Sequence, residues 1–447
     1  MRQVLSTKKL IGMGFMAFAM FLGAGNLIFP PMIGYLAGEH AWLAAAGFLM
    51  TGVGLPLLGI VAISQVGGGF SALAKELPYG LMVLIGSCIF LIIGPLYAVP
   101  RTSMVAFEIG VQPFLGYAGS TWTRLLFSLA FFFIAWYLAL NPGRLLEKVG
   151  EWITPALILL LAVLGISPLL TVSGAAGAPL GQYQNEPVLH GFLEGYLTMD
   201  AMAALMFGIV IITNLQSHGI SEHRALVRYS IFTGIIAATG LALVYISLFY
   251  LGATSREMVV NPANGGDILT VYVDHLLGHV GNIFLAAVVI LACLTTAVGC
   301  ITAASEYFSQ LLPSLRYFWI VTAVSIICVV LAVQGLNEII QLFTPVLFLL
   351  YPLCISFILM GICKPILSMP VLVYRPTLLV VFVFSLLDAA QMMPAFRPMA
   401  ELLSILPGYQ QHLSWAIPGI TCFLLTFLMG KWLSRGASQS VNLGKSR

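Results

Sequence analysis

Long uncharged stretches constrain this chain more than any other feature of its sequence. Each of them exceeds the roughly 20 residues that an α-helix needs to cross the hydrocarbon core of a bilayer. The uncharged stretches are 10–38, 41–74, 152–185, 229–255, 280–305 and 339–363. Only 8% of all residues are charged, whereas soluble domains carry roughly 25%. The sequence therefore predicts an all-α polytopic membrane protein.

Apolar runs bounded by charged residues or by Gly and Pro predict about twelve transmembrane helices. The expected ranges are 10–37, 41–64, 81–106, 121–141, 152–172, 192–217, 226–252, 280–308, 316–335, 338–363, 371–394 and 413–433. No segment has the composition of a soluble domain, so the whole chain, 1–447, is expected to form a single transmembrane domain.

Lys and Arg residues are distributed unevenly between the two sides of this arrangement. Fifteen of the nineteen fall on the side of the termini, which leaves only Arg101, Arg124, Arg256 and Arg397 on the other side. Basic residues concentrate on the cytoplasmic side of membrane proteins. We therefore expect a multi-pass protein of the bacterial cytoplasmic (inner) membrane, with both termini and the basic tail 434–447 in the cytoplasm.

The first predicted helix has a centre that disfavours a continuous helix. Residues 21–31 read FLGAGNLIFPP, and glycine, asparagine and proline are all poor helix formers. We expect the helix to unwind near Gly23–Asn26. Irregular backbone at membrane depth is tolerated where it lines a cavity, and it marks the binding sites of many secondary transporters. The alternative is a glycine packing seam followed by a proline kink.

Polar and ionisable side chains inside the predicted helices are further candidates, because they are costly in a membrane. Asp200 is the strongest, Asp388 lies late in the eleventh helix, and Glu306 suits an interfacial position equally well. In the third helix, a Gly-Pro break precedes Tyr97 and Arg101. Tyr97 could donate to a substrate carboxylate or belong to the aromatic belt, and Arg101 could serve an outer gate or anchor the interface.

Two adjacent hydroxyls in the eighth helix, on Thr295 and Thr296, are hard oxygen ligands of the kind that small cations prefer. A threonine in a membrane helix also commonly bonds a carbonyl of the preceding turn, which leaves a purely structural role open. The few His and acidic residues form no catalytic or metal-binding constellation, so an enzyme is not expected. A channel would need a repeated filter signal, and the sequence has none.

Four motifs resemble the branched-chain amino-acid:cation symporters, bacterial carriers of leucine, isoleucine and valine. They are GAGNLIFPP at 23–31, GPLYAVPRT at 94–102, GYLTMD at 195–200 with FGIVI at 207–211, and ACLTTAVG at 292–299. The resemblance runs through nearly the whole chain. It implies uptake of branched-chain amino acids by cation symport through alternating access. It also implies a LeuT-type architecture, with inverted five-helix repeats at 10–172 and 192–363 and peripheral helices at 371–433.

A more distant resemblance to the neurotransmitter:sodium symporters implies residue roles. A sodium site would comprise the backbone of Ala19 and Leu22 together with Ala292, Thr295 and Thr296. The residues implied to contact the substrate are Phe21, Ala24, Gly25, Asn26, Tyr97, Asp200, Met206, Phe207 and Gly208. Of these, Tyr97 would approach the carboxylate, Met206 and Phe207 would line an apolar pocket, and the amide oxygen of Asn26 would approach a possible second cation.

The coupling ion stays open between Na⁺ and H⁺, because the threonine pair suits sodium and Asp200 could accept a proton. A proton-coupled carrier or exchanger of other neutral amino acids is the alternative within the same class. Apart from the coupling ion we expect no cofactor. The expected partners are the small-molecule substrate, the cation and the lipid bilayer; no nucleic acid is expected, and the sequence carries no signal for an oligomeric state.

Overall fold

The computed structural model describes residues 5–115, 121–140, 176–393 and 407–444, with 159, 163 and 396 as single positions. All regular structure within these ranges is helical. Nine helices in the described part are long and apolar enough to cross a membrane. This confirms an all-α protein with several membrane-crossing helices. The count of twelve stays a prediction, and the predicted helix at 152–172 lies outside the described residues except for two positions.

The first predicted helix is divided into α1 (Thr7–Phe21) and α2 (Ala24–Ala37). The second is divided into α3 (Ala41–Leu49) and α4 (Leu55–Val66), joined by a π-helical turn at Met50–Gly54. A 3₁₀ turn, Gly38–His40, links α2 to α3, and Gly38 has a φ of +51° there. This left-handed backbone favours glycine. The chain therefore changes direction close to the predicted boundary between the two helices.

The third predicted helix contains the expected break. It consists of α6 (Tyr79–Leu91), a π-helical turn at Ile92–Leu96 and α7 (Ala98–Gly110). Gly94 departs from helical geometry, with φ −85° and ψ −115°. Pro95 follows it and has no amide proton for the helical hydrogen-bond ladder. The break places Tyr97 immediately before α7 and Arg101 in the first turn of that helix.

The sixth predicted helix, 192–217, begins later than expected, which is a correction. Residues 192–194 end the short helix α11 (Pro187–Glu194), a 3₁₀ turn covers Gly195–Thr198, and α12 runs without interruption over Asp200–Ser217. Between them Met199 adopts left-handed φ and ψ of +66° and +11°. A residue with a Cβ rarely adopts this conformation. Tertiary packing overrides the apolar pattern here, and Asp200 becomes the first residue of α12.

The remaining long helices follow the predicted order. They are α9 (Thr121–Leu140), α13 (His223–Ala253), α14 (Gly265–Leu311), α15 (Tyr317–Ala332), α16 (Leu336–Cys363), α17 (Pro370–Gln391) and α19 (Ala416–Gly444). Short helices lie at Phe70–Leu73, Gln112–Leu115, Gly181–Gln184 and Lys364–Ile366. Within α14, Gly278 has a φ of +62° and interrupts the helix just before the predicted start of the eighth span.

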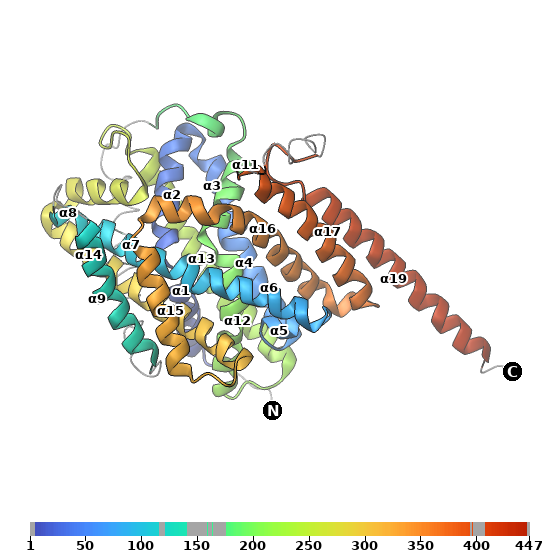
Figure 1. Ribbon diagram of the computed structural model, residues 1–447. Helices are drawn as coiled ribbons and strands as arrows, with labels where there is room; N and C mark the ends of the chain where they lie inside the picture. Colours follow the sequence, from blue (N-terminus) through green and yellow to red (C-terminus); the bar gives the residue numbers. More distant parts are fainter. Residues whose placement is uncertain are drawn as a thin grey trace. The chain divides into compact units, whose positions relative to one another are not determined.

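The described chain forms two compact units. The first comprises 1–57, 87–204 and 231–342, and the second comprises 58–86, 205–230 and 343–447. In the first unit α14 packs against α7, α2, α9 and α15, and α11 packs against α3. In the second unit α17 and α19 run side by side (Figure 1). All the residues of the α1–α2 break and its surroundings belong to the first unit.

Glycines allow helices of the first unit to approach closely around α2. A Cβ atom added at Gly34 would lie 2.2 Å from the carbonyl oxygen of Phe249, and one at Gly252 would lie 2.0 Å from that of Pro31. Small residues allow such close backbone packing in membranes. This seam holds α2 against the C-terminal part of α13, and so brings the start of α2 near Tyr245.

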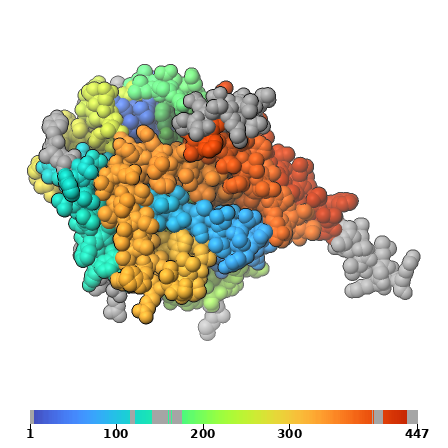
Figure 2. Space-filling model, in the orientation of Figure 1, coloured from blue at the N-terminus to red at the C-terminus, as the bar shows by residue number. Residues whose placement is uncertain are grey.

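Part of the surface of the first unit is strongly apolar. α9 and α15 lie on the face shown in Figure 2. Their exposed side chains include Trp122, Leu126, Phe133, Trp319 and Ile326. A surface of this kind is expected where a protein faces the hydrocarbon of a bilayer, and it agrees with the membrane-crossing assignment of α9.

Candidate functional site

The interruption between α1 and α2 is only two residues long. Leu22 has φ −72° and ψ 85°, and Gly23 has φ −107° and ψ −172°. In a continuous helix the amides of Gly23 and Asn26 would bond the carbonyls of Ala19 and Leu22. Asn26 instead donates to the carbonyl of Gly23 at 3.2 Å. The break therefore leaves the carbonyls of Ala19 and Leu22 without helical donors, and these are the carbonyls for which the distant family resemblance implies a role in binding sodium.

The break confirms the predicted unwinding of the first helix but corrects its extent. Asn26 lies inside α2, and so do Pro30 and Pro31. Each proline removes one helical hydrogen bond without ending the helix. The backbone therefore opens at Leu22 and Gly23 and not at the proline pair.

The threonine pair of α14 separates into two environments. Thr295 donates its hydroxyl to the carbonyl of Ala292 at 2.8 Å, which is the purely structural arrangement. The hydroxyl oxygen of Thr296 is buried and has no hydrogen-bond partner among the described residues. It faces the break, because a Cβ atom added at Gly23 would lie 3.7 Å from it. Thr296 is thus the member of the pair that offers an unused oxygen.

Asp200 is at the centre of a buried hydrogen-bonded group. Its Oδ2 accepts from the Asn26 amide at 2.8 Å and from the Tyr245 hydroxyl at 2.8 Å, and Asn26 also donates to that hydroxyl. Asp200 is only 2% exposed and Asn26 only 1%. As the first residue of α12, the carboxylate also lies at the positive end of the helix dipole. Three separate helices, α2, α12 and α13, therefore form this group.

Arg101 is buried beside the same break, at 3% exposure. Its Nη1 donates to the carbonyl of Leu197 at 2.6 Å and to the hydroxyl of Tyr97 at 3.1 Å. Its guanidinium carbon lies 4.7 Å from the centre of the Tyr97 ring and 5.4 Å from that of Phe29. A position this deep in the protein disfavours an interfacial anchor, whereas a role at an outer gate stays a prediction.

The other predicted site residues divide between the two units. Phe21, Ala24 and Gly25 are buried at the break, as expected, and Tyr97 is fully buried against Arg101. Met206 and Phe207 are buried in the second unit, where Gly208 lies against Ile63. An apolar pocket formed by Met206 and Phe207 stays a prediction.

Tyr245 is a polar member of the site that the sequence analysis did not identify. It lies inside the uncharged stretch 229–255 and is one of several tyrosines there, so nothing in its local sequence sets it apart. Its ring is also held edge-on against Phe48, with centroids 5.1 Å apart. Only a contact between distant segments, such as a co-varying pair, would have indicated it.

Two further predicted candidates have different surroundings. Asp388 is fully buried in α17, and its Oδ1 accepts from the Ser414 amide and the Gln391 side chain, each at 3.4 Å. Glu306 is exposed on α14. Glu306 therefore has the surroundings expected for an interfacial residue.

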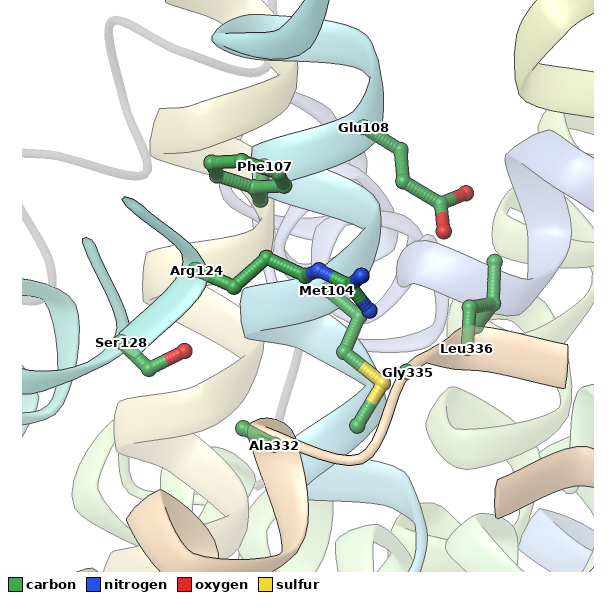
Figure 3. A pocket seen from close by; sticks show the side chains of 8 residues that line it. All are labelled: Met104, Phe107, Glu108, Arg124, Ser128, Ala332, Gly335 and Leu336. Carbon is green, nitrogen blue, oxygen red and sulfur yellow. The ribbon is translucent and has the colours of Figure 1, made fainter. Parts of the chain in front are cut away.

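A separate small polar pocket lies between α7, α9 and the turn from α15 to α16 (Figure 3). Arg124 and Glu108 point into it from different helices. Glu108 accepts a hydrogen bond of 2.7 Å from Asn264. None of the residues that line this pocket belongs to the four sequence motifs. The pocket is therefore separate from the predicted site.

Ionisable groups just outside the membrane-crossing helices have shifted pKa values. Burial raises the pKa of Glu194, at the end of α11, to about 7. Burial also lowers the pKa of His190 in the same helix, while nearby Glu186 raises it. Glu194 therefore titrates near neutrality next to the turn that leads to Asp200.

The chemistry of this site is that of binding. The described residues contain no cluster of His, Cys, Asp and Glu suited to a metal ion of the transition series. They do supply freed carbonyls and a hydroxyl at the break, which are oxygen donors for a small hard cation. They also supply one buried carboxylate and one buried guanidinium, which are poles of opposite charge.

Comparisons with known proteins agree with one another. The family model described as branched-chain amino acid transport protein matches residues 6–433. The chain is 45% identical, over 95% of its length and 97% of the relative, to the branched-chain amino acid transport system 2 carrier protein of Pseudomonas aeruginosa. It is 38% identical to the branched-chain amino acid permease BraB of Bacillus subtilis, over 99% of each chain.

A permease of the same description, BrnQ of Salmonella typhimurium, is 38% identical over 99% of this chain and all of the relative. Among solved structures, Mhp1, a nucleobase-cation-symport-1 family transporter in a closed conformation with bromovinylhydantoin bound, matches with a TM-score of 0.53. The match covers 96% of this chain and 93% of that one at 13% identity, so it concerns the fold alone.

Proposed function

The chain belongs to the family of branched-chain amino acid transport proteins, and we propose that it takes up leucine, isoleucine and valine by sodium symport through alternating access. Relatives are carriers and permeases and not enzymes. Sodium and the amino acid would bind together at the α1–α2 break. The coupling ion would thereby favour the loaded, closed state of the carrier.

One observation carries the proposal: the break at Leu22–Gly23 faces the unpartnered hydroxyl of Thr296. The carbonyls of Ala19 and Leu22, freed by the break, supply further oxygen atoms, and the carbonyl of Ala292 lies on the same helix as Thr296. Oxygen ligands of this kind suit a hard monovalent cation better than a soft metal. We assign Asn26 and Asp200 to the neighbouring polar group that receives the substrate or a second cation.

The wider architecture is part of the proposal. We propose twelve transmembrane helices in a LeuT-type arrangement, with inverted repeats at 10–172 and 192–363 and peripheral helices at 371–433. The fold likeness to Mhp1, itself named a cation symporter, supports such an arrangement. Both termini would lie in the cytoplasm of a cell with the protein in its inner membrane, as the distribution of basic residues indicates.

Symport of one monovalent cation provides enough free energy for accumulation. Moving one charge through 100 mV supplies ~2.3 kcal/mol, which corresponds to a roughly fiftyfold concentration ratio. An apolar pocket separates side chains that differ by one methylene only weakly. Leucine, isoleucine and valine are therefore expected to share the carrier, with Met206, Phe207 and Gly208 as proposed lining residues.

The test is uptake of labelled leucine into proteoliposomes that contain the purified full-length chain. Sodium and proton gradients are imposed separately, at the same membrane potential. We expect accumulation with inward sodium and only equilibration with inward protons. Absence of accumulation with either gradient would refute symport. A second measurement separates a carrier from a channel: unlabelled leucine on the far side of the membrane should accelerate the exchange of labelled leucine only through a carrier.

Proton coupling is a second candidate, and Asp200 is the observation that favours it. The carboxylate is buried and bonded only to neutral groups, Asn26, Tyr245 and Thr198. A carboxyl that gains and loses a proton during transport is favoured by burial without a direct ion pair. Accumulation with a proton gradient in sodium-free medium would replace the sodium proposal with this one.

A further inference from the structure

Arg101 has hydrogen-bond donors that the protein does not use. Of its three nitrogen atoms only Nη1 donates, to Leu197 and Tyr97. Nε is buried without any partner among the described residues. An arginine side chain carries five N–H donors and stays charged in proteins. The Nε donor is therefore unsatisfied in a side chain that is only 3% exposed, which is costly unless something else accepts it.

Arg256, in the same unit, is an arginine whose guanidinium nitrogens all have acceptors within the protein. Its Nε donates to the Tyr35 carbonyl at 2.8 Å and its Nη2 to that of Leu36 at 3.1 Å. Its Nη1 donates to the Ala178 carbonyl. Every nitrogen of Arg256 thus has a carbonyl acceptor. The contrast shows that the open donors of Arg101 are a property of its site and not of arginine in this fold.

The charge of Arg101 also lacks a counter-ion. No carboxylate of the described residues forms an ion pair with it. It is close enough to Asp200 for the two charges to attract each other, but each is held by neutral partners of its own. A buried charge that has no ion pair strongly favours an anion from outside.

The start of α2 adds donors beside the guanidinium. A Cβ atom added at Gly25 would lie only 2.7 Å from Arg101 Nη2. Ala24 and Gly25 form the first turn of α2, where amide groups have no carbonyl behind them in the helix. The N-cap residue Gly23 offers no side-chain acceptor to them. A helix N-terminus and a buried arginine therefore meet at one place, and both favour an anion.

We propose that Arg101 binds the α-carboxylate of the transported amino acid. The planar guanidinium matches a carboxylate through two parallel hydrogen bonds, and Tyr97 and Phe29 fix its plane. Asp200, held apart by Asn26 and Tyr245, forms the opposite pole for the α-ammonium group. Two separated, buried charges of opposite sign are complementary to a zwitterion. This inference rests on the proposed function, because it names the group of the amino acid that the carrier recognises.

The experiment compares leucine with leucinamide, which keeps the ammonium group and side chain but replaces the carboxylate with a neutral amide. Binding to the purified full-length protein is measured by competition with labelled leucine. Loss of one partner of a buried charge pair typically costs 2–5 kcal/mol, so we expect wild type to bind leucinamide roughly 100-fold more weakly than leucine. Arg101→Gln should lose roughly 100-fold in leucine affinity and less than about threefold in leucinamide affinity.

Two further variants keep the test decisive. Arg101→Lys retains the charge without the planar fork, and it decides the question if the glutamine variant does not fold. We expect its loss, roughly tenfold, to be confined to leucine. Arg256→Gln is the matched control, which should lower thermal stability and leave the ratio of leucine to leucinamide affinity unchanged.

The outcomes separate the two proposals. A wild-type protein that binds no leucine refutes the proposed function itself. A wild-type protein that binds leucine, together with Arg101 variants that lose leucine and leucinamide equally or lose neither, refutes only the role of Arg101. A loss confined to leucine supports it, since a merely structural defect would weaken both ligands.

Discussion

Two buried aspartates of this protein have opposite surroundings. Asp200 begins α12 directly after a left-handed residue, and its Oδ2 accepts from the Asn26 amide and the Tyr245 hydroxyl at 2.8 Å each. Asp388 lies within the continuous helix α17, and its Oδ1 accepts two long bonds of 3.4 Å from nearby Gln391 and Ser414. Its Oδ2 has no partner among the described residues.

The difference shows that burial alone does not identify a functional acid. Both side chains are inaccessible, but only Asp200 adjoins irregular backbone and receives partners from two other helices. Irregular backbone in a membrane is retained where it lines a ligand site. This contrast supports the proposed substrate or ion site around Asp200, and it favours a structural role for Asp388 at the α17–α19 pair.

The largest expected difference in leucine uptake is between variants of the two aspartates. Asp200→Asn should reduce leucine uptake roughly 100-fold, because it removes one buried charge from the proposed zwitterion site. Asp388→Asn should reduce uptake less than about threefold, since an amide oxygen still accepts from Ser414. Initial uptake rates in proteoliposomes, normalised to inserted protein, measure both. Equal losses of leucine uptake in the two variants would show that Asp200 and Asp388 do not differ in their importance for transport.

A second comparison sharpens the ion site within that region. Thr296→Ala removes the unpartnered hydroxyl and should raise the sodium concentration for half-maximal uptake roughly tenfold, as expected for about 1.4 kcal/mol of ligand interaction. Thr295→Ala removes a hydroxyl that already bonds the Ala292 carbonyl, and it should change the sodium concentration for half-maximal uptake less than about twofold. Sodium titrations of leucine uptake provide the numbers. Unchanged sodium dependence in the Thr296 variant would exclude it from the ion site.

Glycine substitutions test the close packing at the break. Gly25→Ala should weaken leucine binding roughly fivefold, because its Cβ would press on the Arg101 guanidinium and overpacking costs at least about 1 kcal/mol. Gly12→Ala is the control, since nothing lies within 4 Å of a Cβ atom there. The control should bind leucine normally and melt at an equal or higher temperature. Normal binding by both variants would show that the contact is not needed.

The smallest expected effect concerns Glu194, an acid outside the membrane-crossing helices. Its pKa is raised to about 7 by burial, so the folded state keeps this proton where the unfolded chain has lost it. The stabilisation is complete below the unfolded pKa of 4.5 and disappears as pH rises to about 7.

Glu194→Gln should therefore melt above wild type at pH 8, where the buried carboxylate of wild type is ionised, and match it near pH 4.5. Melting curves of the purified protein at the two pH values measure this. A variant that melts below wild type at pH 8 would show that the ionised carboxylate is stabilised in the folded protein, in contrast to the burial effect.

Much of the fold was predictable because it depends on local composition. Uncharged stretches located most of the membrane-crossing helices, and the Gly and Pro positions located the breaks before α2 and α7. The start of α12 was missed because Met199 has the side chain of a good helix former, and its left-handed conformation is imposed by packing. The proline pair at 30–31 was expected to help break the helix, but α2 continues through both residues.

Several residues of the candidate site were singled out from the sequence, but their arrangement was not predicted. Asn26, Tyr97, Asp200 and Thr296 were identified from motifs and resemblance. Tyr245 was not identified, because no feature of the local sequence distinguishes it from the other tyrosines in that apolar helix. The burial of Arg101 was not predicted either, because its place along the sequence suggests the outer boundary, whereas in the structure it lies against Gly25 and Leu197.

The sequence by itself determined that this protein is a helical membrane protein and that its first helix opens at Gly23. Hydropathy and helix propensity depend on residues within a few helical turns, so the local sequence is enough to predict them. Only the tertiary structure decided that Asn26 meets Asp200 across 174 positions, and that Arg101 keeps donors open beside Gly25. The partners of a buried charge come from other helices, and their approach depends on the packing of the whole unit.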